Sequence, residues 1–105
     1  MMSDVPLARV HEQGARIVVS GEIDASTAHR ITELVDLHLD ERNPVIRLDL
    51  RATSFCDSAG LVTLLDCRAA ATSRGARLVL VAPSDAVARL LELTGLEVAF
   101  EIEPG

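Results

Sequence analysis

The sequence alternates between short apolar segments and segments in which apolar residues recur every three or four positions. The short segments predict β-strands, and they lie at residues 16–20, 45–50, 77–82 and 97–102. The intervening segments predict helices, and they lie near residues 26–42, from Asp57 or Ser58 to Arg74, and from Pro83 to Gly95. Residues 5–12 can supply a further strand that forms a hairpin with the first. This order predicts an α/β fold with parallel strands joined by right-handed crossovers, and the length suits a single domain, residues 1–105.

The polar residues of the second predicted strand limit how many helices can cover the sheet. In this strand Arg47 and Asp49 alternate with apolar residues, whereas residues 77–82 are apolar on both faces, as in a central strand. A parallel sheet that lies between two helical layers is apolar on both faces throughout. We therefore expect a small mixed sheet with helices packed mainly on one face, and the alternating segment 97–102 at its edge.

The composition excludes several classes of function. The chain has ten arginines and no lysine against 16 acidic residues, for a formal charge of −6, whereas a nucleic-acid-binding surface needs basic residues to replace counterions. Its aromatic residues are Phe55 and Phe100, too few for a surface on which single-stranded bases stack. No apolar run approaches the roughly 18–20 residues that span a bilayer, and the N-terminus has no signal-peptide pattern. We expect a cytoplasmic protein that binds no nucleic acid and does not insert into the membrane.

Two cysteines, Cys56 and Cys67, are too few for a disulfide framework. If residues 58–73 form a helix, Cys67 lies roughly 14 Å along it at about 1.5 Å per residue, whereas the Cα atoms of a disulfide lie within about 7 Å. We expect two free thiols in a reducing compartment. Cys56 precedes Asp57 near a helix start, where a thiol can be reactive, but the interpretation we favour is a small buried apolar residue.

The loops that follow parallel strands meet at the carboxyl edge of a sheet, where functional sites usually form. Here these loops are Gly21–Asp24, Thr53–Ser58 and Ala82–Asp85, each with an acidic residue and a potential helix cap. Asp24, Ser26 or Thr27 can cap the first helix. We expect the three loops to form one candidate site.

Ser58 lies where the second helix is expected to begin, and it has two interpretations. A serine at this place often caps the helix, which contributes on the order of 1 kcal/mol. Alternatively Ser58 is modified, because the free N–H groups and the helix dipole at this end stabilise a phosphate of about −1.5 to −2 charges. Asp57 and Asp24 would then repel the phosphate and alter the docking surface. Gly60 would leave the first turn open for the close approach of another chain.

Three segments and the end of the chain carry a family resemblance: Val18–Asp24, Leu48–Leu50, Phe55–Leu61 with its Asp-Ser-x-Gly motif, and Val87–Leu96. In this order and spacing they resemble a STAS domain, specifically a stand-alone bacterial anti-sigma factor antagonist. The resemblance covers roughly residues 5–103. It implies the STAS-like α/β fold, without catalytic residues, metal or cofactor.

The resemblance also implies a partner-switching role. The unmodified antagonist binds an anti-sigma factor that is also a serine kinase, and this binding frees a sigma factor for transcription. The kinase phosphorylates the residue that corresponds to Ser58, complex formation is lost, and a metal-dependent serine phosphatase restores it. Asp57 corresponds to the acidic neighbour of the phosphoacceptor and Asp24 to the acid of the facing loop. Gly60 and Leu61 correspond to the start of the recognition helix.

Ala59 departs from the family pattern, in which this position is often Ser or Thr, and Gly60-Leu61-Val62 replaces a common Gly-Leu-Gly. Both departures leave the phosphoacceptor in place but can alter which kinase docks. The expected partner-binding residues are Asp24, Asp57, Ser58, Ala59, Gly60 and Leu61.

Two other functions compete with this interpretation. A serine hydrolase needs a base beside Ser58, but His11 precedes the core strands, and His29 and His38 face opposite sides of their helix. That spacing also excludes a two-histidine metal site on the helix. A closer alternative is a STAS domain that acts without phosphorylation, as a scaffold or transport-associated module, although the pair Asp57-Ser58 favours the switch. We expect a binding protein and not an enzyme.

Overall fold

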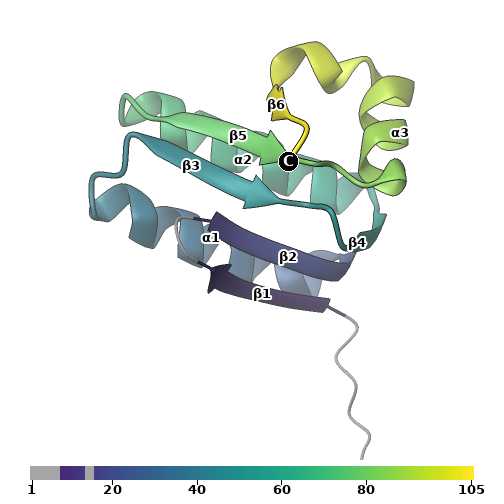
Figure 1. Ribbon diagram of the computed structural model, residues 1–105, viewed down its shortest axis with the longest axis horizontal. Coiled ribbons are helices and arrows are strands. Elements are labelled where there is room, and N and C mark those ends of the chain that lie inside the picture. The colour runs from purple at the N-terminus through teal and green to yellow at the C-terminus, as the bar shows by residue number, and fades with distance from the viewer. Residues whose placement is uncertain (1–7, 14–15) are drawn as a thin grey trace, which may run out of the picture.

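A mixed β-sheet with helices on one side forms the body of the protein (Figure 1). The computed structural model describes residues 8–13 and 16–105. Its elements in chain order are β1 (Ala8–Gln13), β2 (Arg16–Ile23), α1 (Ala25–Asp40), β3 (Val45–Asp49), β4 (Thr53–Cys56), α2 (Ser58–Ser73), β5 (Arg77–Val81), α3 (Asp85–Thr94), the 3₁₀ helix η1 (Leu96–Ala99) and β6 (Glu101–Glu103).

The strand order confirms the predicted α/β sheet. The strands lie in the order β1-β2-β3-β5-β6, and β4 pairs with the second half of β2, beyond the end of β3. β1 runs antiparallel to β2, and all other pairs are parallel. β1 is the predicted hairpin partner, although residues 5–7 of that prediction lie outside the described residues.

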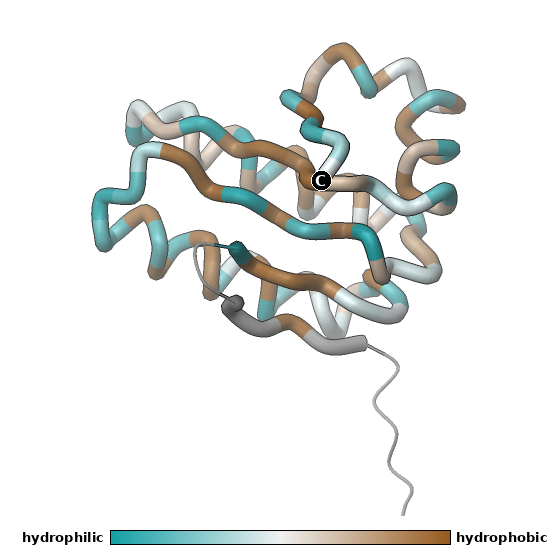
Figure 2. The backbone as a smooth tube through the Cα atoms, in the orientation of Figure 1, coloured by the Kyte–Doolittle hydropathy of each residue, from teal (hydrophilic) through white to brown (hydrophobic). Residues whose placement is uncertain are grey.

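α1 and α2 pack side by side on one face of the sheet, and α3 lies at one end of the sheet against β4 (Figure 1). Between the helices and the sheet lies an aliphatic core. Its fully buried members include Ile17, Val19, Ile23, Ile31, Ile46, Leu48, Leu64 and Leu80. Figure 2 shows β5 as mainly apolar and β3 as alternating, which fits a central strand and a strand with one polar face.

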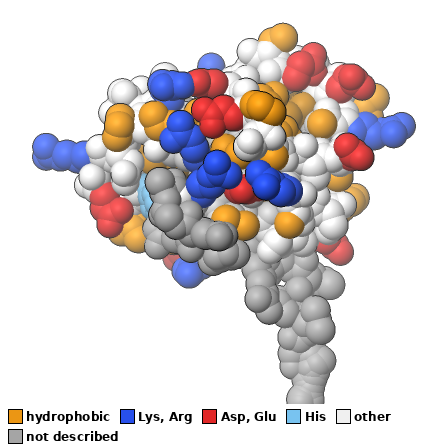
Figure 3. Space-filling view, viewed as in Figure 1, with side chains coloured by type: hydrophobic (Ala, Val, Ile, Leu, Met, Phe, Trp, Pro, Cys, Tyr) orange, Lys and Arg blue, Asp and Glu red, His pale blue; other side chains and the backbone are white. Residues whose placement is uncertain are grey.

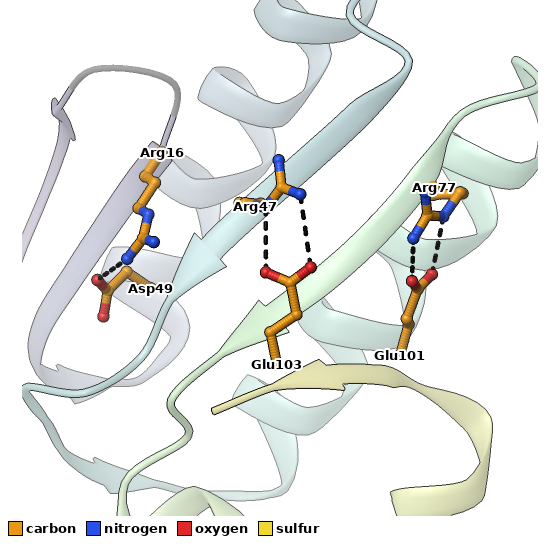
Figure 4. A network of polar contacts seen from close by, with 6 residues as sticks. All are labelled: Arg16, Arg47, Asp49, Arg77, Glu101 and Glu103. Carbon is orange, nitrogen blue, oxygen red and sulfur yellow. Dashed lines mark hydrogen bonds and ion pairs between the residues drawn. The ribbon is translucent and has the colours of Figure 1, made fainter. Parts of the chain in front are cut away.

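Paired charges cover the other face of the sheet (Figure 4). Among the described residues, no second layer of helices packs on this face. On this face Arg47 and Asp49 stand opposite Val79 and Val81, which are nevertheless fully buried. The ion pairs are Arg16–Asp49 at 3.2 Å, Arg47–Glu103 at 3.1 Å and Arg77–Glu101. Long side chains of this kind cover apolar surface with their stems while their charged ends stay in water. Figure 3 shows the two signs of charge interleaved on this face. Because α1 and α2 lie on the other face (Figure 1), the prediction that helices pack mainly on one face is confirmed.

The predicted loop Thr53–Ser58 is partly wrong, because Thr53–Cys56 form the strand β4. β3 ends at Asp49, and β4 then takes over the pairing with β2 as far as Ile23. The sequence does not indicate this strand, because it contains two hydroxyl side chains and its buried and exposed residues do not alternate. β4 is important for the site because α2 begins almost directly after it.

The predicted last strand, 97–102, is wrong in its first half. Leu96–Ala99 form the 3₁₀ helix η1, and only Glu101–Glu103 pair with β5, at the edge of the sheet. Gly95 ends α3 with a left-handed φ of 72°, and the extra turn of η1 follows directly. Val98 is therefore 87% exposed, although its place in the alternating pattern suggests a buried residue.

Candidate functional site

The three loops expected at the carboxyl edge of the sheet are joined by the pairing of β2 with β4 and by backbone hydrogen bonds to the turn at residues 50–52. The N–H of Gly21 donates to the carbonyl of Ala52 at 2.9 Å, which joins the end of β2 to the turn before β4. The N–H of Ser84 donates to the carbonyl of Leu50 at 3.2 Å, which joins the same turn to the start of α3. The prediction that these loops come together is confirmed, and the first turn of α2 lies among them.

Asp57, and not Ser58, is the N-cap of α2. Its backbone is extended, and its Oδ1 accepts the N–H of Gly60 at 3.0 Å, while its carbonyl accepts the N–H of Leu61 at 3.0 Å. The interpretation of Ser58 as the capping serine is therefore wrong. Asp and Ser are about equally good caps, so the two adjacent residues could not be separated by propensity.

Ser58 is the first residue of α2, and its side chain is exposed. Within the described part of the chain its hydroxyl takes part in no hydrogen bond. The N–H groups of Ser58 and Ala59 lie in the first turn, where a helix offers no carbonyl partner and its dipole favours negative charge. Ser58 thus presents a free hydroxyl at a place that can stabilise an anion.

Asp24 is the N-cap of α1, the first of the three candidates for that role. Its Oδ1 accepts the N–H of Ser26 at 3.0 Å and the hydroxyl of Ser26 at 2.7 Å, and the N–H of Thr27 at 3.2 Å. The Thr27 hydroxyl in turn accepts the N–H of Asp24 at 3.0 Å and completes a capping box. The hydrogen bond from the Ser26 hydroxyl is the main cause that lowers the pKa of Asp24 below its usual value. Asp24 therefore keeps a fixed negative charge at neutral pH.

Gly60 has a different role from the predicted one. A Cβ at this residue would lie 2.7 Å from the Sγ of Cys56 and 2.9 Å from the Cγ2 of Ile23. The missing side chain therefore lets α2 pack closely against β2 and β4 of its own domain, and does not leave the turn open to another chain. Leu61 is likewise buried in the core. Of the predicted partner-binding residues of this turn, Ser58 and Ala59 have exposed side chains, whereas Gly60 and Leu61 act by holding the helix in place.

The family is decided by comparison with known proteins. A model of the family described as "Mlab, STAS domain" matches residues 8–102. The chain belongs to the STAS domain family. The resemblance drawn from the sequence motifs is thereby confirmed.

This STAS domain has similar relatives and solved structures. It is 38% identical over 87 residues to the anti-sigma-B factor antagonist of Listeria monocytogenes serovar 1/2a, a match that covers 83% of this chain and 76% of the relative. The crystal structure of an anti-sigma factor antagonist from Mycobacterium paratuberculosis has a TM-score of 0.73 at 29% identity, over 93% of this chain and 85% of that chain. The anti-sigma factor antagonist SpoIIAA, solved in its unphosphorylated form, has a TM-score of 0.69 at 19% identity, over 90% of this chain and 86% of that chain, and shares the fold.

The two cysteines of this STAS domain are free and buried. Burial, together with the nearby charge of Asp57, raises the pKa of the Cys56 thiol to about 11. Burial and the carboxylates of Asp36 and Asp66 raise the pKa of Cys67 to about 12. Because the nucleophile is the thiolate, the alternative of a reactive Cys56 is wrong, and the favoured interpretation of a buried apolar residue is confirmed.

Other chemistry at this edge has little support in the described residues. His29 is exposed on α1, where its Nε2 lies 3.4 Å from the Oε2 of Glu33, and it makes no hydrogen bond to Ser58. The described residues contain no group of three or more His, Cys, Asp or Glu that could hold a metal ion. None of the described helices is long and apolar enough to cross a membrane.

Two residues beside the site were not predicted from the sequence. Phe55 on β4 is 50% exposed, and its cross-strand neighbour is Glu22 on β2. A phenylalanine in a chain with so few aromatic residues is expected in the core, and no local pattern indicates its exposure. The pairing of β4 with β2 is needed to place both residues.

The cap at Asp57 leads to a stability prediction. Asp57→Ala should lower the free energy of unfolding by about 1 kcal/mol, because it removes the acceptor of the Gly60 N–H, whereas Asp57→Asn should change it by only a few tenths. Urea unfolding followed by circular dichroism measures both. Asp66→Ala, an exposed carboxylate on the same helix, is the control and should stay within about 0.5 kcal/mol of the wild type. Equal stability of Asp57→Ala and the wild type would contradict the assignment of the cap.

Proposed function

We propose that this STAS domain is an anti-sigma factor antagonist whose unmodified form binds an anti-sigma factor and so frees a sigma factor for transcription. The observation that carries the proposal is the exposed hydroxyl of Ser58, which directly follows the N-cap Asp57 and forms no hydrogen bond within the described residues. It occurs in a chain 38% identical to an anti-sigma-B factor antagonist. The protein acts by binding and not by catalysis, in the cytoplasm, without direct contact with nucleic acid.

The anti-sigma factor is at the same time a serine kinase that modifies Ser58. The Ser58 oxygen attacks the γ-phosphorus of ATP, an O–P bond forms as the bond to the β–γ bridging oxygen breaks, and ADP leaves. The serine proton passes to a base of the kinase. A serine phosphatase later hydrolyses the phosphoserine and returns the binding-competent form.

The expected consequence of the phosphate is a change of the surface and not of the fold. The first turn of α2 favours added negative charge through its N–H groups and its dipole. The carboxylates of Asp57 and Asp24 repel the same charge, and a dianion with its water shell does not fit an interface shaped for a hydroxyl. The domain therefore stays folded while the complex with the anti-sigma factor is lost.

The test is phosphorylation of the intact protein by purified candidate anti-sigma kinases from the genome that encodes this chain. With ATP, we expect a mass gain of one phosphate on Ser58 for the wild type and no gain for Ser58→Ala. Peptide mass spectrometry then places the phosphate. If no kinase modifies Ser58 and the protein instead binds a transporter-type partner, the chain is the unphosphorylated scaffold or transport-associated module and the switch is excluded.

A further inference from the structure

Phe55 is the one aromatic side chain near the site, and it faces solvent. The chain has two phenylalanines and no Trp or Tyr. Phe100 is 7% exposed and packs in the core, whereas Phe55 is 50% exposed. Leaving half of a large aromatic side chain in water gives up part of the stabilisation that its full burial would contribute. The exposure of Phe55 therefore lacks an explanation in the packing of the domain.

A β-bulge in β4 turns Phe55 outward. Gly21 pairs with Thr53, but the next residue, Glu22, pairs with Phe55, so that Ser54 is an extra residue in the ladder. In a regular strand that begins with buried Thr53, Phe55 would be buried and Cys56 exposed. The extra residue reverses this order, since Cys56 is buried and Phe55 is exposed. The local backbone thus specifically presents this aromatic ring three residues before Ser58.

The carboxylates around Phe55 differ from those on the face of the sheet that lies away from α1 and α2. On that face, Asp49, Glu101 and Glu103 are all paired with arginines (Figure 4). Within the described part of the chain, no ion pair is formed by Glu22, Asp24 or Asp57. Glu22 stands directly opposite Phe55 in the ladder, and the other two cap the helices that start at this edge.

We propose that Phe55 is the anchor of the surface on which the anti-sigma factor docks, an inference that rests on the proposed function. The docking surface consists of Phe55, Ser58, Ala59 and Val62 with the carboxylates Glu22, Asp24 and Asp57. Val62 is 54% exposed and follows Ser58 by four residues on α2, so both lie on the same side of the helix. The partner surface is a protein surface with an apolar pocket for the phenyl ring and a rim of arginine or lysine side chains. Aromatic anchors seated in such pockets supply much of the energy of protein interfaces.

A basic rim on the partner is compatible with the loss of binding when Ser58 is phosphorylated. A serine that is phosphorylated must approach the γ-phosphate of ATP, so the part of the partner that faces Ser58 holds the phosphates of its nucleotide. The basic rim faces the carboxylates around Phe55 instead. A phosphate on Ser58 therefore meets other phosphates, while its bulk keeps Phe55 from its pocket.

The test compares single-alanine variants of exposed apolar residues in titration calorimetry with the anti-sigma kinase that phosphorylates Ser58. Phe55→Ala should raise Kd about 30-fold, as expected for an interface anchor, and Val62→Ala should raise it less. The matched control is Leu37→Ala, which removes a 46% exposed side chain from the last turns of α1 and should change Kd less than about twofold. Glu22→Gln should weaken binding modestly and reduce its dependence on salt. Urea midpoints close to the wild type show that the variants are folded.

Each outcome of this experiment decides between the two proposals. If Phe55→Ala binds like Leu37→Ala while Ser58→Asp abolishes binding, Phe55 is not the anchor and the switch at Ser58 stands. If Phe55→Ala instead lowers self-association of the purified protein in sedimentation and leaves the kinase affinity unchanged, a second copy occupies the surface and the inference is overturned. If the wild type neither binds any candidate kinase nor gains phosphate, the proposed function fails, and this inference fails with it.

Discussion

Ser58→Asp is expected to weaken binding to the anti-sigma factor by about 30-fold or more, whereas Ser58→Ala should leave Kd within about threefold of the wild type. A charge that is buried in an interface without a partner costs about 2–5 kcal/mol, and each 1.4 kcal/mol is tenfold in Kd. The carboxylates of Asp24 and Asp57 repel this charge more strongly once the interface excludes water, and Asp24 keeps a pKa below its usual value. Titration calorimetry with the purified anti-sigma kinase measures both variants.

Ser58→Asp should bind the anti-sigma factor more weakly than the wild type but should be slightly more stable. Ser58 is exposed and is not the cap, so the substitution breaks no hydrogen bond among residues 8–13 and 16–105. A carboxylate in the first turn gains about 0.3–1 kcal/mol from the helix dipole. The matched control is Ser73→Asp at the other end of α2, where the same charge is unfavourable for the helix and far from the docking surface. It should be slightly less stable but bind normally. Equal affinities of Ser58→Asp and Ser58→Ala would exclude an electrostatic switch at this residue.

The architecture could be predicted because it depends on periodicity, which is local in the sequence. The alternation of Arg47 and Asp49 with apolar residues required one face of β3 to be polar, and this alone argued against a second helical layer. The structure adds how that face is made stable: its carboxylates and arginines pair over Val79 and Val81. The pairing partner of Arg47 is Glu103, which is 56 residues away in the chain. No local pattern indicates a contact at that separation.

The details of the site depend on contacts that are not local. β4 and its bulge exist because β2 extends beyond β3 and offers a second pairing segment. The exchange of Phe55 and Cys56 between core and solvent follows from one extra residue in that ladder. The choice of Asp57 over Ser58 as the cap has a similar origin, since α2 must start where Gly60 can pack against β2 and β4. Sequence propensities could name the residues of the site but could not assign these roles.

The close contact of Gly60 with the sheet holds the start of α2 in place. Substitution of this glycine should therefore have the largest effect on stability. Gly60→Val should lower the free energy of unfolding by about 2–3 kcal/mol, because added atoms in a packed core displace their neighbours. For a domain of this size, this corresponds to a fall of about 10–20 °C in Tm. The neighbours of the new Cβ would be Ile23, which is β-branched, and the short side chain of Cys56, and neither can rotate away as a long flexible side chain would.

Ala59→Val is the matched control for this packing effect, because it places the same side chain one residue earlier on the exposed side of the same turn. It should cost no more than the difference in helix propensity, about 0.7 kcal/mol or less. Differential scanning calorimetry of both variants beside the wild type separates packing from propensity. If Gly60→Val is as stable as Ala59→Val, the first turn of α2 is free to move away from β2 and β4. Ser58 would then be presented by a mobile helix end and not by a rigid one.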